Sequence, residues 1–320
     1  MQKEIILDFE KPILKLYEKI NSLKALSEKS LIDLSEEINV LKAKVLKIKQ
    51  DVYDNLRPDQ IIKISRHPLR PTTLDYISLI FTDFVELHGD RCFGDDPAIV
   101  GGFSRINGQK IAVIGHQKGK DTKDNIYRNF GMPQPEGYRK ALRIMQLAEK
   151  LSMPVITFVD TPGAFPGIEA EKHGQAEAIA RNLKEMSALK VPVLSLITGE
   201  GGSGGALGIA VANEVLILEF AVYSVISPEG CAAILFNDAK RSAEAAVALK
   251  ITAPELIKLK VVDGIVSEPP GGAHLNPEAM AETMKTTILN SLEKYKKLSP
   301  EKIRQERFKK FRAFGFFEEK

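Results

Sequence analysis

Two glycine-rich turns are the segments of this chain best suited to chemistry, DTPGAFPG at residues 160–167 and GEGGSGGA at residues 199–206. Each follows a short apolar run, 155–159 and 193–197, and precedes a stretch with helical periodicity. Glycine lets the backbone approach a ligand closely, and the first turn of a helix leaves its N–H groups without intrahelical partners. The pattern therefore predicts an anion hole made of main-chain N–H groups, suited to an enolate, a phosphate or a carboxylate.

The second turn also matches a dinucleotide-binding fingerprint, Gly199-x-Gly201-x-x-Gly204, with Glu219 at a suitable distance behind it. This interpretation is the weaker one, because the unit is not the first strand of the body. The turn also carries more glycine than the fingerprint requires. We therefore do not expect a nicotinamide cofactor.

Other catalytic motifs are incomplete. Asp160-x-x-Gly163 resembles a GTPase switch, but the segment that would supply the phosphate loop has Lys120 followed by Asp121, where serine or threonine is needed. The five histidines show no metal-ligand spacing, so no metal site is expected. We expect Ser203 to cap the helix after the second turn rather than to act as a nucleophile.

Composition excludes several classes of protein. Among 320 residues, 45 lysines and arginines nearly balance 42 aspartates and glutamates, so no overall field favours nucleic acid. Cys92 and Cys231 are far apart, as in a reducing compartment, and we expect both to be buried thiols. The first residues lack the pattern of a secretory signal, and no apolar run could span a membrane. We therefore expect a cytoplasmic protein without a membrane anchor.

The N-terminal part is predicted to be a helical hairpin, residues 1–53, and the remainder, 54–320, a catalytic domain. Apolar residues recur every three or four positions between Ile13 and Val52, with a polar break at 27–30. The later run comprises Leu31, Leu34, Ile38, Leu41, Val45, Ile48 and Val52. This seam is expected to pack on itself, on the main body or on another subunit.

The remaining pattern predicts an α/β body. Prolines and arginines at 57–71 indicate a linker, after which Thr72 or Thr73 caps a helix whose apolar side is expected to continue to Leu87. Asn107-Gly108 predicts a β-hairpin. Strands and helices then alternate, and the helices are expected at 138–150, 170–188, 203–211, from Pro228, and at 277–297. A basic, aromatic tail, Arg304 to Phe317, is expected to pack against the body or a partner rather than nucleic acid.

Several blocks of sequence together resemble one enzyme family. They are GDRCFGDDPAIVGG at 89–102, DTPGAFPG, GEGGSGGA, YSVISPEGCA at 223–232 and EPPGGAH at 268–274. In this order, and with likeness over nearly the whole chain, they resemble the carboxyltransferase α subunit of the multi-subunit acetyl-CoA carboxylase. The resemblance implies a crotonase-like fold, in which stacked ββα turns form a superhelix. It also implies transfer of a carboxyl group from carboxybiotin to acetyl-CoA, giving malonyl-CoA.

The resemblance also assigns roles to individual residues. It implies that Gly204 and Gly205 form the hole for the ureido oxygen of carboxybiotin, with the Ala206 N–H nearby, and that the biotin pocket is lined by Gly163, Ala164 and Phe165. Similar proteins carry tyrosine in place of Phe165, so a hydrogen bond from that hydroxyl is in question here. For Gly271-Gly272, a tight turn and a functional role are about equally well supported.

The resemblance further implies partners and substrates. It predicts an α2β2 assembly with a β subunit of the same fold, a biotin carboxyl carrier protein that presents carboxybiotin as substrate, and biotin carboxylase in the wider complex. No cofactor is expected to be covalently bound to this chain. Two rival functions are a crotonase-like binding protein without turnover, and an acyl-CoA hydratase or isomerase that would use Glu200 and Glu229.

Overall fold

One mixed sheet forms the centre of the protein, in a computed structural model that describes residues 7–30 and 33–315. In this part of the chain the sheet has eight strands, in the order β1-β2-β3-β4-β5-β6-β8, and β7 pairs with β5. The strands are β1 (Thr82–Glu86), β2 (Ile99–Ile106), β3 (Gln109–His116), β4 (Val155–Thr161), β5 (Val193–Gly202), β6 (Glu214–Leu218), β7 (Val222–Ser224) and β8 (Gly264–Val266).

Strand direction changes within the sheet as the sequence predicts. β1, β2 and β3 pair antiparallel, whereas β3 to β6, β7 and β8 pair parallel. The tight connection between β2 and β3 is made by Asn107 and Gly108, both with positive φ, 46° and 78°. Those angles suit a two-residue hairpin turn, which explains why Asn-Gly occupies it. The apolar run of β4 is buried along its whole length, as in a strand covered on both faces.

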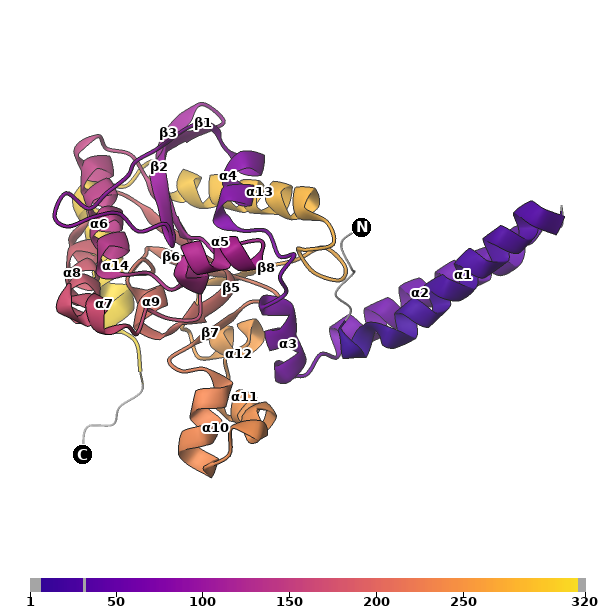
Figure 1. Ribbon diagram of the computed structural model, residues 1–320. Coiled ribbons are helices and arrows are strands. Elements are labelled where there is room, and N and C mark those ends of the chain that lie inside the picture. Colours follow the sequence, from indigo (N-terminus) through magenta and orange to yellow (C-terminus); the bar gives the residue numbers. More distant parts are fainter. Residues whose placement is uncertain (1–6, 31–32, 316–320) are drawn as a thin grey trace.

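Helices cover both faces of the sheet (Figure 1). Tyr76 of α4 stacks on Phe158 of β4. The adjacent residue of β4, Thr157, pairs with Ile114 of β3, and the side chain of Ile114 lies on the face covered by α6. Because neighbouring residues of a strand point to opposite faces, α4 and α6 lie on opposite sides. The helices of the body are α3 (Pro58–Ser65), α4 (Thr73–Ile80), α5 (Thr122–Tyr127), α6 (Pro135–Lys150), α7 (Ile168–Lys172), α8 (Gln175–Ala188), α9 (Ser203–Leu207), α10 (Pro228–Phe236), α11 (Ser242–Leu249), α12 (Ala253–Lys258), α13 (Pro277–Tyr295) and α14 (Pro300–Arg312), with 3-10 turns at Asp8–Glu10, Asn129–Gly131 and Ala239–Arg241.

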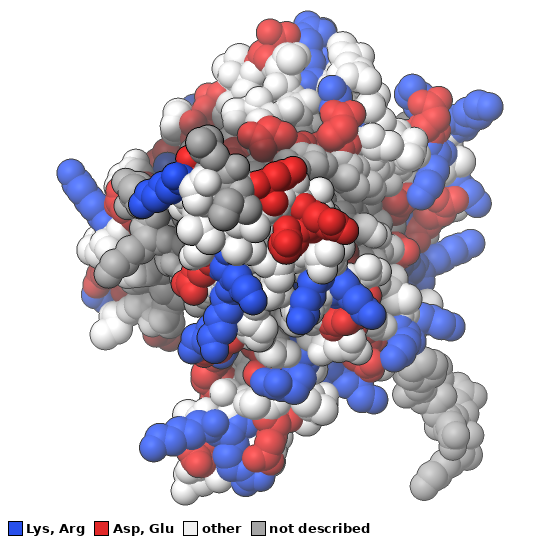
Figure 2. All heavy atoms as spheres, turned by 90° about the vertical axis from the view of Figure 1, so that its right-hand side faces the viewer, with Lys and Arg blue, Asp and Glu red and all other residues white. Residues whose placement is uncertain are grey.

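The predicted helical hairpin is confirmed as α1 (Lys11–Ser30) and α2 (Ser35–Asp54), which project from the body (Figure 1). Its seam packs on itself through Ile13, Ile20, Ile38 and Val45, and its base packs on Phe220 of the body. Leu31 lies outside the described residues. Figure 2 shows acidic and basic side chains interspersed on the side from which the hairpin projects.

Three predicted elements need correction. The segment 57–71 is not merely a linker, because Pro58 occupies the first turn of helix α3, where proline needs no N–H partner. The helix capped by Thr72 ends at Ile80, so the apolar residues up to Leu87 belong to β1 and the loop after it. The helix predicted at 170–188 is two helices, α7 and α8, because Gly174 takes a φ of 86° between them.

The basic tail packs against the body, one of its two expected positions. Arg307 of α14 is fully buried. Its guanidinium donates to the backbone carbonyls of Met186, Leu189 and Val191 at 2.7–2.8 Å, and to the side chain of Asn213. Burial lowers the pKa of Arg307 to about 10, so the group stays charged at neutral pH. The aromatic residues at 316 and 317 lie outside the described residues.

The two cysteines differ in environment. Cys231 is buried as predicted, but Cys92 is exposed, and the expectation of a buried thiol there was wrong. The carboxylate of Asp90 accepts the N–H groups of Cys92, Phe93 and Gly94, and this contact shapes a surface loop. Within residues 7–30 and 33–315, no helix has the length and apolar character needed to span a membrane, and no group of three metal-ligating side chains is found.

Candidate functional site

The two glycine-rich turns lie in direct backbone contact. A Cβ atom on Gly202 would lie 2.2 Å from the carbonyl oxygen of Pro162, and one on Gly205 would lie 2.4 Å from the carbonyl carbon of Gly163. Carbon atoms normally approach no closer than about 3.5 Å. Glycine is therefore required at both positions of the second turn for the first turn to pack against it.

The structure brings together most of the residues predicted for the site. Gly204, Gly205 and Ala206 occupy the first turn of α9, and the backbone of Gly163 and Ala164 lies against Gly205. Parallel strands β4 and β5 carry the turns at their carboxyl ends, which is why the turns meet.

Phe165 is oriented differently from its neighbours. Its ring packs back on its own loop, where a Cβ on Gly167 would lie 2.4 Å from a ring carbon. Its backbone N–H donates to the carbonyl of Pro133 at 2.9 Å, and its carbonyl accepts the side-chain amide of Gln175. The ring thus supports the loop, while the backbone of Gly163 and Ala164 forms the contact with the second turn.

The start of α9 has no side-chain cap in the described part of the chain. The capping position is Gly202, so the prediction that Ser203 caps this helix was wrong. Ser203 is exposed and adopts a φ of 50°, an unusual conformation for a residue with a side chain. Uncapped N–H groups at the start of a helix are available to an anion.

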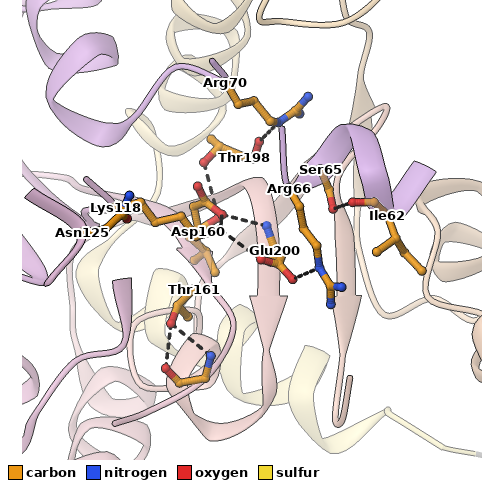
Figure 3. Close-up of polar contacts among 12 residues, drawn as sticks. Ile62, Ser65, Arg66, Arg70, Lys118, Asn125, Asp160, Thr161, Thr198 and Glu200 are labelled. Carbon is orange, nitrogen blue, oxygen red and sulfur yellow. Dashed lines mark hydrogen bonds and ion pairs between the residues drawn. The ribbon is translucent and has the colours of Figure 1, made fainter. Parts of the chain in front are cut away.

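A chain of ion pairs lies directly behind the turns (Figure 3). Lys118 donates to Asp160 at 2.7 Å and to Glu200 at 3.0 Å. Arg66 contacts the other oxygen of Glu200 at 2.6 Å and reaches Glu229, at the start of α10, at 2.7 Å. The network joins the ends of β4 and β5 to α3 and α10.

Backbone contacts make this network part of the turns themselves. The same Asp160 oxygen that binds Lys118 accepts the N–H of Glu200 at 2.9 Å, and a Cβ on Gly199 would lie 2.4 Å from it. In the other turn, the Thr161 hydroxyl donates to the carbonyl of Gly163 at 2.7 Å and accepts its N–H. Both turns are thereby held in one conformation.

The ion pairs keep the glutamates charged. Burial alone would raise the pKa of Glu200, but Lys118 and Arg66 lower it below its usual value. Hydrogen bonds from Arg66 lower the pKa of Glu229 as well. A carboxylate with a lowered pKa is a poor general acid, so this arrangement does not favour the hydratase alternative.

A second buried ion pair supports the adjacent strand. Arg70 forms two hydrogen bonds to Glu268, at 2.5 and 2.9 Å, and donates to the carbonyl of Thr198 at 2.8 Å. After Glu268, Gly271 and Gly272 adopt φ values of 93° and 104°, so these glycines serve a tight turn. The sequence analysis did not predict the ion pairs of Arg66, Arg70 and Lys118, because their partners are distant in the sequence. The charged composition of the segments that contain these residues was the one signal for such pairs.

An apolar groove of about 420 Å³ opens beside the start of α9. Its walls combine the second turn with the C-terminal helix and the loop after β7. They include Ser203, Gly204, Leu207, Val225, Phe311 and Phe314. The groove places apolar surface next to backbone N–H groups, an arrangement suited to a ligand with a flat apolar part and a polar oxygen.

Comparisons with known proteins match this chain over its full length. Residues 6–315 match the family described as acetyl co-enzyme A carboxylase carboxyltransferase-like. The chain is 55% identical over 319 residues to the acetyl-coenzyme A carboxylase carboxyl transferase subunit alpha of Geobacter metallireducens, covering 100% of each. It is 55% identical over 313 residues to the protein of the same name from Thermus thermophilus, covering 98% of this chain and 99% of that one.

Solved structures show the same fold at low sequence identity. The transcarboxylase 12S core with methylmalonyl-coenzyme A and methylmalonic acid bound aligns with a TM-score of 0.58 at 20% identity, over 71% of this chain and 42% of that one. A Pseudomonas malonate decarboxylase hetero-tetramer in complex with coenzyme A aligns with a TM-score of 0.56 at 14% identity, over 68% and 86%. These likenesses confirm the predicted crotonase-like fold.

Proposed function

Because the chain belongs to the family of acetyl-CoA carboxylase carboxyltransferase α subunits, we propose that its two glycine-rich turns form the half of the active site that receives carboxybiotin. The enzyme is a carboxyltransferase, and the name of its relatives as α subunits implies a multi-subunit complex with a β subunit. The observation that supports the location of the site is the backbone contact between Gly205 and Gly163.

The proposed roles follow from where charge develops. Release of CO2 from carboxybiotin leaves negative charge on the ureido oxygen, which the N–H groups of Gly204 and Gly205 would stabilise, with Ala206 nearby in the same turn. One such donor is typically worth about 3 kcal/mol in the transition state. The biotin anion then takes a proton from the methyl group of acetyl-CoA, and the resulting carbanion attacks CO2 to form malonyl-CoA. No protein side chain is needed as the base.

The remaining site residues would hold the biotin rings. We propose that Gly163, Ala164 and Phe165 line the pocket, with Phe165 acting through the loop that its ring supports. Carboxybiotin would arrive as a substrate on a biotin carboxyl carrier protein, and nothing need be attached covalently to this chain.

The proposed assembly is an α2β2 heterotetramer, with biotin carboxylase in the wider complex. Residues 1–53 would serve assembly, and residues 54–320 would form the catalytic domain. Since acetyl-CoA is an intracellular metabolite, we propose that the reaction takes place in the cytoplasm.

The decisive experiment measures carboxyl transfer from malonyl-CoA to biocytin by the chain alone, by its β subunit alone and by the two together. Turnover is expected only from the two subunits together, because this chain holds a single crotonase-like unit and the proposed site is completed by the β subunit. Full activity of the single chain would refute the shared site. Crotonyl-CoA is the matched test of the hydratase alternative, and we expect no hydration of it by the same complex.

A further inference from the structure

Helices α10 and α11 form a lobe that projects from the body (Figure 1). The lobe begins at the ion-pair network, where Arg66 links Glu229 of α10 to Glu200 of the second glycine turn. Val225, shortly before α10, lines the apolar groove together with Gly204. The lobe therefore starts at the rim of the proposed site.

The lobe has a small apolar core of its own. Cys231 and Ala232 of α10 pack with Ala245 of α11, in a cluster that is separate from the main core around the sheet. The next residue of α11, Ala246, shares another cluster with Ile62 of α3. In the described part of the chain these contacts cover one side of each helix and leave the other side in solvent.

The solvent-facing sides of both helices are apolar as well. Each helix has a single charged residue, Glu229 in α10 and Glu244 in α11, and both lie in the first turn. Ile234 and Leu235 of α10 are 75% and 64% exposed, and Val247 of α11 is 61% exposed. A helix that is apolar all round is normally buried, since a solvent-facing side usually carries charged and polar residues. Exposed apolar surface of this kind marks an interaction site.

The character of this surface favours a permanent partner. Interfaces of obligate complexes are more apolar than those of transient ones. A carrier protein must arrive and leave in every turnover, so it fits an uninterrupted apolar surface poorly. A second copy of this chain also fits less well, because the rim of a site that is shared with the β subunit must be reached by that subunit.

We propose that the exposed sides of α10 and α11, with Ile234, Leu235 and Val247, are a docking surface for the β subunit. This inference rests on the proposed function, because it takes the site as one that the β subunit completes. Docking on the lobe brings the β subunit to the mouth of the groove. The lobe serves binding, and none of these three side chains takes part in the chemistry.

The test measures the Kd of the β subunit for variants of this chain by sedimentation velocity. Ile234→Glu would bury a charge in the interface and should raise the Kd by about 100-fold or more. Ile234→Ala removes contact area while keeping a good helix former, and it should raise the Kd by about tenfold. Both variants should keep the unfolding temperature of the single chain, because Ile234 is largely exposed. At saturating β subunit, carboxyl transfer from malonyl-CoA to biocytin should stay within about twofold of the unsubstituted complex.

Leu151→Glu is the matched control. Leu151 is 55% exposed and follows the last residue of α6, before β4 begins at Val155. It therefore lies at the opposite edge of the sheet from the glycine turns, which follow the end of β4. The same charge at this position should leave the Kd of the β subunit unchanged.

Each outcome decides the proposal. An unchanged Kd in Ile234→Glu, or an equal rise in Leu151→Glu, would overturn it. Self-association of the single chain that Ile234→Glu abolishes would assign the surface to a second copy instead. Slower transfer from the biotinylated carrier at an unchanged Kd for the β subunit would assign it to the carrier. If the unsubstituted complex forms but transfers no carboxyl group, the proposed function fails, whereas the Kd values still decide where the β subunit docks.

Discussion

The sharpest test of the site is the substitution Gly205→Ala, which adds a single methyl group where the two turns meet. The new Cβ would lie 2.4 Å from the carbonyl carbon of Gly163 and 2.5 Å from the nitrogen of Ala164. Ordinary contacts between such atoms begin near about 3.5 Å, so the turns must separate by roughly 1 Å. Both neighbours are backbone atoms, so no side-chain rotation relieves the contact.

A separation of this size predicts a defined loss of activity. Oxyanion donors act over about 2.7–3.1 Å, so a shift of roughly 1 Å removes one donor and should lower kcat by about 100-fold to 1,000-fold. The added strain should cost about 1–3 kcal/mol of unfolding free energy. Carboxyl transfer from malonyl-CoA to biocytin by the complex with the β subunit measures the first effect, and thermal unfolding measures the second.

Gly204→Ala is the matched comparison. There the new Cβ would meet only the side chain of Ile179, at 3.7 and 3.8 Å, which is ordinary packing distance. This variant should keep its thermal stability, and its kcat should be at least tenfold higher than that of Gly205→Ala. If a folded Gly205→Ala complex keeps normal turnover, the close approach plays no part in catalysis; equal losses in the two variants would refute the reasoning from contact distance.

Three further predictions concern the network, the tail and the hairpin. The pKa values of Glu200 and Glu229 are lowered in the folded protein, so these carboxylates stabilise it above about pH 4.5 and this stabilisation is lost as the pH falls through their folded pKa values. Because Arg66 contributes to both shifts, the unfolding free energy of Arg66→Met should fall less steeply on acidification, as measured by urea denaturation at a series of pH values. Arg307→Met should lower the unfolding free energy by about 3 kcal/mol, because three buried carbonyls lose their donor, and a loss below about 1 kcal/mol would contradict this. Removal of the residues before Asp54 should dissociate the complex at dilute concentration more than it lowers turnover per assembled site, and an unchanged sedimentation profile would reject an assembly role for the hairpin.

Local signals in the sequence were enough for much of the fold. Asn107-Gly108 specifies its turn because both residues accept positive φ, and the uniform apolar run of β4 indicates a strand buried on both faces. Such features depend only on neighbours in the chain. The two glycine turns could likewise be placed together, because consecutive parallel strands bring their carboxyl ends to the same edge.

Features that depend on distant partners could not be predicted. Lys118 meets Glu200 across 82 positions and Arg70 meets Glu268 across 198, and neither pair has a periodic signature. Gly174 and Gly202 also misled prediction in opposite ways: the first divides a continuous helical pattern, and the second takes the capping position expected of Ser203. The name of the reaction came from the resemblance of whole sequence blocks, since backbone N–H groups alone do not distinguish among anions.

The buried guanidinium of Arg307 has a consequence for synthesis of the chain. Its partners at Met186, Leu189 and Val191 lie more than a hundred positions earlier, with separations of 121, 118 and 116 residues. The end of α8 and the segment that follows it are therefore translated long before their guanidinium donor exists. Completion of the core is postponed until α14 docks. A polypeptide cut short before Arg307 would lack this donor for three carbonyls of its core.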